Sequence, residues 1–539
     1  MGDGVLFFPI GLDIGEISIA LLVGILVLLA IGVPLGFASA FLGILVLFEK
    51  FGGRGLDLVM QRIYDLTLSY PIIAVPLFIL MASLLERSGI ARDMYDALSL
   101  MLRRIRGGVA VVTTVMAVIM AAMSGIIGGE IVLLGLVALP QMLRLKYNQN
   151  LAIGTICAGG SLGTMIPPSI VLIIFGLVTE TSIDSLFTAA FIPGLMMGGL
   201  YIVYILVRTQ LQPHLAPFDP AHETLPQRPT RDRLIDAALC LAPILLGVAL
   251  YFPGQGEALQ QALDQIAADA MAAGREVREL RPRELENIVQ AIHVHSLAVA
   301  IFASAVLILA SVTYLERFMP NRGRRFMIAR GLLPPLLVVD VVLGSIYGGV
   351  TGITEAAGIG CVAALLLILI RSELNFTRFN QALTQTFRSV GTILWVTFGA
   401  TILAGAYTLA GGPTYVAGSI LGMDLPPMGI ILMMMLIFIV LGMFMDWIGI
   451  VLLTMPVFMP IVTGLGYDPI WFGILFCINM QVSFLSPPFG PAAFYLKSVA
   501  PPHIDLIAIY RSFGPFICLQ LVVLGLVLLF PEIALVFAR

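Results

Sequence analysis

The chain has 539 residues, of which 59% are hydrophobic and only 11% are charged, and its formal net charge is -3. Soluble domains carry about 25% charged residues, so the composition excludes an ordinary soluble protein. No basic tract suggests nucleic acid as a partner. Apolar runs long enough to span a bilayer recur along the chain, and they are too continuous for a transmembrane barrel. The composition therefore predicts an all-α, multi-pass membrane protein.

Apolar segments that could span or re-enter a membrane follow one another almost from the start of the chain. The acidic N-terminus lacks a positive region and a cleavage site, so the first apolar segment is expected to remain as a membrane helix. We expect such segments near 15–49 (broken at Gly32 and Pro34), 69–86, 108–124, 126–143, 151–178, 187–208, 234–252, 294–315, 331–348, 355–371, 390–411, 426–444, 447–463, 470–496 and 512–537.

A central stretch, 211–315, differs from its surroundings. It contains two apolar runs, with one polar segment before the first run and a second polar segment between the two runs. The strongly basic stretch 317–330 is expected in the cytoplasm by the positive-inside rule. With one helix between them, the polar segment 253–293 should then lie on the outer side, and the proline-rich loop 211–233 should be cytoplasmic. We interpret 211–315 as an inserted helix pair.

The two parts of the chain that flank this insert repeat each other. When the sequence is shifted by 320 residues, Pro140 coincides with Pro460, Cys157 with Cys477, and Pro167-Pro168 with Pro487-Pro488. We therefore predict a first repeat over 1–210 and a second over 316–539. Such repeats are often inverted in secondary transporters, and we expect inversion here.

Each repeat contains one apolar segment that is interrupted by a Pro-Pro pair, at about 151–178 and 470–496. Proline lacks an N–H, and the residue before it avoids helical geometry, so each segment should form two half-helices. The free carbonyl ends suit a cation such as Na⁺, and the free N–H ends suit a carboxylate. Nearby hydroxyl and amide groups could add ligands: Ser161, Thr164, Ser169, Asn479, Gln481, Ser483 and Ser486. A plain proline kink in each segment is the alternative.

Before each broken segment, two apolar runs meet at a glycine-rich point and predict a re-entrant hairpin, at about 108–143 and 426–463. The two tips carry carboxylates at different positions, since Glu130 has Ile450 as its counterpart. Asp446 could bind a cation or cap the helix that follows it. Glu130 could carry a proton, pair with a cation, or cap backbone at its tip.

Four motifs in order, "GGSLGTMIPPSIVLIIFG", "IYGGVTGITEAAGIG", "MFMDWIGIVLLTMPVFMPI" and "FLSPPFGPAAFYLKSVAPP", resemble those of the large membrane subunit of tripartite ATP-independent periplasmic (TRAP) transporters. The chain is similar to a longer subgroup with a central insert. The resemblance implies an elevator-type carrier of the ion-transporter superfamily in the bacterial cytoplasmic (inner) membrane. It also implies a Na⁺ gradient, a separate small four-helix membrane subunit, a periplasmic substrate-binding protein and a carboxylate-bearing organic acid as substrate.

The same resemblance implies that the hairpin tips and Pro-Pro breaks form the sodium and substrate sites, with no cofactor besides the coupling ions. For the first sodium site we expect Ser124, Gly125, Gly160, Ser161, Gly163 and Thr164. For the second we expect Asp446, Gly449, Asn479, Gln481, Ser483 and Ser486. The substrate is expected at Thr164, Pro167, Ser169, Ser486 and Pro487, with Glu130 as a coupling residue. The first tip departs from the Ser-Gly-Ser pattern of relatives, because Ile126 follows Ser124-Gly125.

Three alternative functions remain at this point. A stand-alone carrier or antiporter of the same superfamily would need no binding protein. A multi-pass membrane enzyme is disfavoured because the chain has no HExxH or GxSxG motif and no histidine in the breaks, so no catalytic residues are expected. A channel fits matched broken helices less well than alternating access does.

Overall fold

The computed structural model describes residues 11–102, 105–125, 128–217, 301–313 except 302 and 312, 324–422, and 425–538. The polar segment predicted at 253–293, most of the insert and part of the basic stretch lie outside these residues. Within them, all regular structure is helical. Eight helical stretches among them are long and apolar enough to cross a membrane. The predicted all-α, multi-pass fold is confirmed.

The helices of the first half follow the predicted order, with two additions. The break expected at Gly32 and Pro34 separates the first two helices. The additions, α3 and α5, are amphipathic, with acidic residues in the first turn that interrupt the apolar run. The helices are α1 (Ile14–Ala30), α2 (Leu35–Phe51), α3 (Gly55–Thr67), α4 (Ala74–Arg87), α5 (Ile90–Leu102), α6 (Gly108–Ser124), α7 (Gly129–Arg144), α8 (Gln149–Ser161), α9 (Ile170–Thr179) and α10 (Ile183–Leu211), with 3-10 turns η1 (Gly52–Arg54), η2 (Tyr70–Ile73), η3 (Leu162–Thr164) and η4 (Pro213–Leu215).

The second half contains one helix that is much longer than expected. This helix, α15, begins at Phe376 rather than near 390, because its first turns carry polar and charged residues that hide its helical continuation from a hydropathy reading. The helices are α13 (Arg324–Tyr347), α14 (Ile353–Ile370), α15 (Phe376–Leu409), α16 (Gly412–Leu421), α17 (Pro427–Gly442), α18 (Trp447–Gly464), α19 (Pro469–Leu485), α20 (Pro491–Lys497), α21 (Leu506–Leu529) and α22 (Glu532–Leu535).

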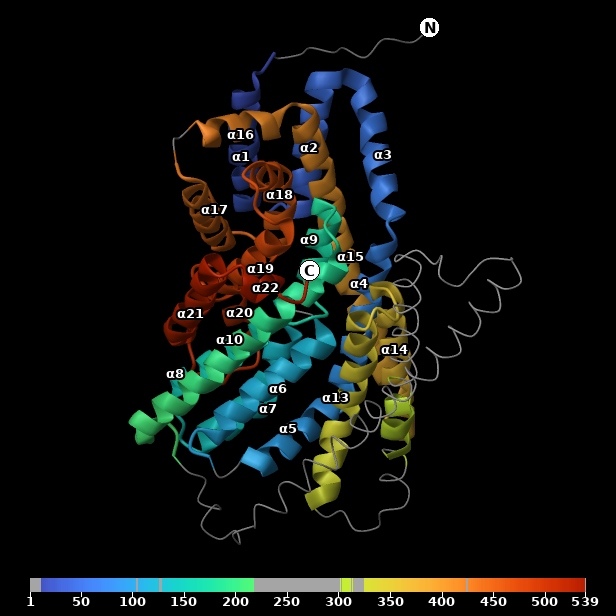
Figure 1. Ribbon diagram of the computed structural model, residues 1–539, viewed down its shortest axis with the longest axis vertical. Coiled ribbons are helices and arrows are strands. Elements are labelled where there is room, and N and C mark those ends of the chain that lie inside the picture. The colour runs from blue at the N-terminus through green and yellow to red at the C-terminus, as the bar shows by residue number, and fades with distance from the viewer. Residues whose placement is uncertain are drawn as a thin grey trace, which may run out of the picture.

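The helices form two groups that meet along the long axis of the molecule (Figure 1). In one group, α4, α13, α14 and α15 pack against one another. In the other, the hairpins α6–α7 and α17–α18 pack with the broken segments α8–α9 and α19–α20. Contacts cross between the halves, since α9 packs on α18 and α20 packs on α7. This exchange brings both hairpin tips and both breaks to the middle of the molecule.

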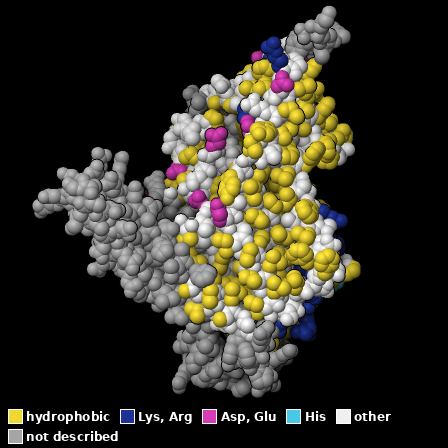
Figure 2. All heavy atoms as spheres, turned by 90° about the vertical axis from the view of Figure 1, so that its right-hand side faces the viewer, with side chains coloured by type: hydrophobic (Ala, Val, Ile, Leu, Met, Phe, Trp, Pro, Cys, Tyr) yellow, Lys and Arg dark blue, Asp and Glu magenta, His cyan; other side chains and the backbone are white. Residues whose placement is uncertain are grey.

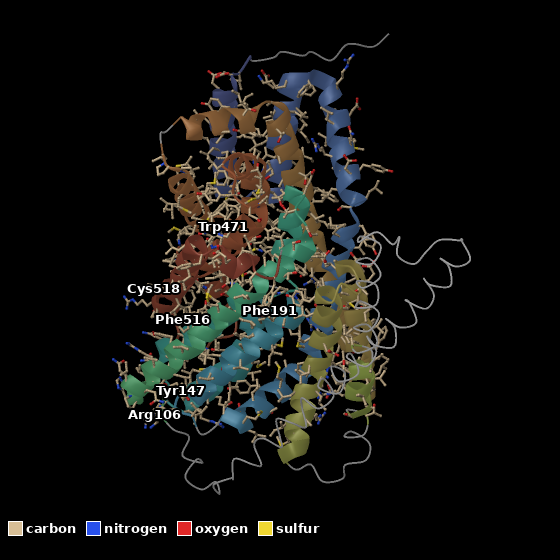
Figure 3. All side chains as sticks on the ribbon, viewed as in Figure 1. Arg106, Tyr147, Phe191, Trp471, Phe516 and Cys518 are labelled. Atoms are coloured by element: carbon tan, nitrogen blue, oxygen red, sulfur yellow. The ribbon has the colours of Figure 1, made fainter. Side chains whose placement is uncertain are left out.

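Helices α10 and α21 hold the broken segments in place from outside. The indole Nε1 of Trp471, on α19, donates to the carbonyl of Val527 on α21 at 2.8 Å. The ring of Phe516, on α21, meets Tyr201 and Tyr204 of α10 edge-on, with centroids 5.4 and 5.3 Å away. Figure 3 shows Trp471 and Phe516 in this region. Aromatic packing of this kind fixes the half-helices against neighbours that are themselves continuous.

One side of the molecule exposes many large apolar side chains. Figure 2 shows the side on which α3 and α14 lie, and hydrophobic side chains cover most of its described surface. On α3, Met60 is 70% and Tyr64 is 64% exposed, and on α14, Val362 is 56% exposed. Such a continuous apolar surface is suited to lipid or to another membrane protein, and not to water.

Candidate functional site

The first broken segment is a helix that stops at the Pro-Pro pair. Helix α8 begins at an N-cap, where the Asn148 side chain accepts from the N–H groups of Asn150 and Leu151. It continues through η3 to Thr164, loses helical hydrogen bonding before Ser169, and gives way to α9 at Ile170. All residues from 161 to 170 are buried. Because the break is buried, its unpaired backbone groups must be satisfied by protein, a ligand or enclosed water.

The second broken segment has the same architecture but a more open break. Helix α19 ends at Ser486, whose backbone is extended (φ -80°, ψ 130°), and α20 begins at Pro491. Pro487, Pro488 and Phe489 are exposed. Both Pro-Pro bonds, at 167–168 and 487–488, are cis.

Each break touches the tip of the hairpin in its own half. At the first tip, Gly125 ends α6 with φ +57°, and a side chain built there would collide with the carbonyl oxygen of Pro168. At the second tip, the N–H of Phe489 donates to the carbonyl of Met443 at 3.3 Å. The tips and the breaks therefore form two backbone-to-backbone contacts, one in each half.

The two tip carboxylates have different surroundings. Glu130 is only 3% exposed and accepts a hydrogen bond from the Ser124 hydroxyl through Oε1, whereas its Oε2 is buried with no hydrogen-bond partner. Asp446 occupies the N-cap position of α18, near the N–H groups of Trp447 and Ile448. Its side chain is exposed and lines a cavity between the hairpin tips and α15.

A cavity of about 460 Å³ lies where the tips meet α15. Among the described residues that line it, two are charged, Asp446 and Arg388, and Arg388 lies on α15. Gln385, Ser389 and Thr392 lie on the same face of α15 as Arg388, at helical spacing, and form the polar wall with it. The opposite wall is largely apolar and includes Trp447, Phe484, Phe489 and Tyr495. Gly125 of the first tip also reaches the cavity.

Sequence reasoning missed this polar wall. Arg388 and its neighbours precede the apolar run that was expected to begin near 390, so they were not assigned to a membrane helix at all. The signal that could have found them is their spacing at 385, 388, 389 and 392, which places four polar groups on one face of a continuous helix.

A second, narrow gap next to the cavity joins the two halves. It is lined by Thr164 from the first break, by Gly442 and Asp446 from the second tip, and by Ser483 from α19. Thr164 is expected at the first sodium site and the substrate site, and Asp446 and Ser483 are expected at the second sodium site. All three line this one gap.

Other predicted site residues make local contacts. Within the first break, Thr164 donates to the carbonyl of Ser161 at 2.9 Å, and Ser169 donates to the carbonyl of Thr164 at 2.6 Å. Ser161 donates to Ala158, and Gln520 of α21 approaches the Ser161 hydroxyl at 3.5 Å. Gly163 and Pro167 are buried in the same stretch. These hydroxyl groups bridge the interrupted turns.

The remaining predicted residues divide between the site and its surroundings. Gly160 packs against Ile131 at the start of α7, and Gly449 packs against Leu35 of α2. Asn479 turns toward α17, where its amide lies 2.8 Å from the sulfur of Met435. Three more residues lie at the second break or in the turns of α19 that precede it: Gln481 is buried with neither amide atom hydrogen-bonded, Ser486 donates to Val482 at 2.8 Å, and Pro487 is exposed.

The groups gathered here are suited to binding. They are backbone carbonyl and N–H groups at half-helix ends, hydroxyls, two carboxylates and one guanidinium. Among the described residues there is no group of three or more His, Cys, Asp or Glu side chains that could hold a metal ion of the kind such clusters bind. The carbonyl, hydroxyl and carboxylate oxygens among these groups suit hard cations.

Comparisons with known proteins agree with this picture. The family model described as "Tripartite ATP-independent periplasmic transporter, DctM component" matches residues 22–533. The chain is 24% identical to the C4-dicarboxylate TRAP transporter large permease protein DctM of Pseudomonas aeruginosa, over 88% of this chain and 87% of that one. It is 25% identical to the ectoine TRAP transporter large permease protein TeaC of Halomonas elongata, over 96% and 97%.

A solved structure shares the fold. The YdaH transporter of Alcanivorax borkumensis superposes with a TM-score of 0.53 at 16% identity, over 89% of both chains. The family match, together with the eight apolar helical stretches, defines a multi-pass transporter subunit of the inner membrane, and the relatives are named as transporter permeases. The chain belongs to the DctM family of TRAP transporter large permeases.

Proposed function

We propose that this permease carries out sodium-coupled uptake of a carboxylate-bearing organic acid that a periplasmic binding protein delivers. The observation that carries the proposal is the cavity between α15 and the tips, where one guanidinium, Arg388, faces two half-helix breaks. A guanidinium binds a carboxylate through paired hydrogen bonds. The apolar wall opposite would hold the body of the acid.

Sodium would bind where half-helix carbonyl ends meet the tips. For the first ion the proposed residues are Ser124, Gly125, Gly160, Ser161, Gly163 and Thr164. For the second they are Asp446, Gly449, Asn479, Gln481, Ser483 and Ser486. The fit is supported by the narrow gap that Thr164, Asp446 and Ser483 line, and by the buried oxygen atoms of Gln481 and Glu130 that have no hydrogen-bond partner among the described residues. Substrate contacts are proposed at Thr164, Pro167, Ser169, Ser486 and Pro487.

Alternating access by an elevator movement fits the two groups of helices. The cavity lies on their boundary, since Arg388 belongs to α15 in one group and Asp446 to the hairpins of the other. A movement of the hairpins and broken segments along α15 would carry the bound groups past a fixed wall. The inverted repeat proposed for 1–210 and 316–539 would supply equivalent inward and outward states.

Two protein partners complete the proposal, a small four-helix membrane subunit and a periplasmic substrate-binding protein. The family description names a tripartite transporter, of which this chain would be one part. Relatives are named for C4-dicarboxylate and for ectoine, so the family as such does not fix the substrate.

Uptake into liposomes tests the proposal. The chain would be reconstituted with its small subunit, with and without the binding protein and a sodium gradient, using labelled acids and their neutral amides. Acids should enter only when both are present. Arg388→Ala should raise the substrate KM by about tenfold or more, and Arg388→Lys by less, because lysine keeps the charge but not the paired geometry.

Arg378→Ala is the matched control, because Arg378 is an exposed arginine on the same helix outside the cavity. It should leave the KM unchanged. Uptake without the binding protein would instead support a stand-alone carrier. Equal KM values for the Arg388 and Arg378 variants would contradict the assigned substrate wall.

A further inference from the structure

The first hairpin tip contains a carboxylate whose surroundings do not satisfy it. Glu130 is 3% exposed, and only its Oε1 has a partner, the Ser124 hydroxyl. Its Oε2 is buried with no hydrogen bond in the part of the chain that the structure describes. A buried ionised carboxylate is costly unless it is paired or coordinates a cation, and without such a partner it takes up a proton. No described basic side chain forms an ion pair with it.

Two features of the position of Glu130 act in opposite directions. Glu130 is the second residue of α7, two positions after the glycine N-cap Gly128, and the free N–H groups of a helix start stabilise a negative charge. Burial and a second carboxylate, Glu86 of α4, which lies against Gly129, oppose ionisation of Glu130. A cation at this point would remove that opposition, because it would compensate the charge of the buried carboxylate.

Oxygen atoms that could bind a cation lie near the same tip. Ser124 can donate its proton to Oε1 and still offer lone pairs to an ion. Helix α6 ends at this residue, so its last carbonyl groups point toward the tip. Gly160 of α8 packs directly against Ile131, next to Glu130, which brings the end of α8 close.

We infer that Glu130 is itself a ligand of the cation bound at the first hairpin tip, with Ser124 as its neighbouring ligand. The ion would then compensate the charge of the Glu130 carboxylate, which lowers the cost of moving this buried group through the membrane. This inference rests on the proposed sodium coupling and adds a charged ligand to a site otherwise made of neutral oxygens.

Binding can be measured without transport. The full chain in detergent would be heated at increasing NaCl, with choline chloride keeping the ionic strength constant, because an ion that binds the folded state raises the melting temperature. Glu130→Gln keeps the shape and hydrogen-bonding capacity but removes the charge. It should raise the sodium concentration at half-maximal stabilisation by about tenfold or more. Ser124→Ala should raise it by less.

Asp340→Asn is the matched control. Asp340 of α13 also accepts a serine hydrogen bond, from Ser304, but it lies away from both tips. Its variant should respond to sodium as the wild type does. If Glu130→Gln does not give a monodisperse protein, Glu130→Asp, which keeps the charge, should retain a sodium response that is weaker than that of the wild type.

The outcomes separate the inference from the function on which it rests. A wild-type protein that sodium does not stabilise would contradict the proposed sodium coupling itself. A wild type that responds, together with a folded Glu130→Gln variant that responds at the same sodium concentration, would overturn only the role of Glu130.

Discussion

The two hairpin tips have similar backbones and different chemistry. Both tips contact the break in their own half, the first through Gly125 and Pro168 and the second through Met443 and Phe489. Their carboxylates differ, because Glu130 is buried at the first tip whereas Asp446 lines the cavity.

This difference teaches that the internal repeat preserves helix ends and close approaches, whereas the side chains have diverged. Backbone groups at a break provide cation and anion ligands whichever side chains surround them. The charged groups can then differ between the halves, one contributing to a closed site and the other to an open, substrate-facing one. Substitutions at each tip and each break test this difference between the closed site and the open site.

The largest effect is expected from Asp446→Ala, which removes the carboxylate shared by the cavity and the narrow gap. Sodium-driven uptake should fall by about a hundredfold or more, because both the ion and the alignment of the tip depend on this group. Uptake into liposomes with a sodium gradient measures the loss, and the melting temperature reports on folding.

Asp505→Ala provides the control, since Asp505 also stands at a helix N-cap without a capping hydrogen bond, before α21. It should transport normally. Sodium-dependent uptake that survives in Asp446→Ala would remove Asp446 from the proposed second site.

The next comparison replaces each Pro-Pro pair by Ala-Ala, which lets a helix continue through the break. At 487–488 the pair is exposed, so the protein should fold and lose transport. At 167–168 the pair is buried, so its replacement should lower both transport and the melting temperature. Equal melting temperatures for the two variants would show that burial does not distinguish the breaks. Sodium-dependent uptake that is retained in a variant would show that the break it replaces is only a proline kink.

Much of the architecture could be predicted from the sequence because it depends on local signals. The Pro-Pro pairs define where α8 and α19 give way to new helices, and the glycine-rich points define the hairpin tips. The repeat offset then aligns the two halves. These signals are backbone properties of proline and glycine, so they can be recognised in the sequence without knowledge of distant neighbours.

The cavity could not be predicted in the same way. Arg388 and Asp446 line the same cavity only because α15 packs beside the second hairpin, and sequence distance gives no indication of that packing. Similarly, nothing in the sequence distinguishes Gly449, which packs against Leu35, from a glycine that approaches a ligand. The sequence likewise does not indicate that the amide nitrogen of Asn479 lies against the sulfur of Met435. Side-chain direction depends on tertiary packing, which periodicity alone does not specify.

A smaller effect should come from Gly125→Ala at the first tip. Alanine is strained at φ +57°, and its methyl group would press on the carbonyl of Pro168, which is backbone and cannot rotate away. The tip should therefore separate from the break, and the sodium concentration for half-maximal uptake should rise by roughly tenfold. A variant with wild-type sodium dependence would show that the tip does not need this contact.

The smallest effect, and the one that can be reversed, is expected at the second tip. A methyl group on Gly442 would clash with the Oγ and Cβ atoms of Ser483, and the Cβ cannot rotate away. Gly442→Ala should still raise the sodium concentration for half-maximal uptake by less than Gly125→Ala does, because Gly442 lies in helix α17, where alanine is not strained, and because the clashing atoms can be removed by substitution. Adding Ser483→Gly to Gly442→Ala should restore the space while also removing a proposed ligand hydroxyl. If Ser483 only fills space, the double variant should regain wild-type sodium affinity. If its hydroxyl binds the ion, the double variant should refold to the wild-type melting temperature without sodium and still require more sodium for uptake.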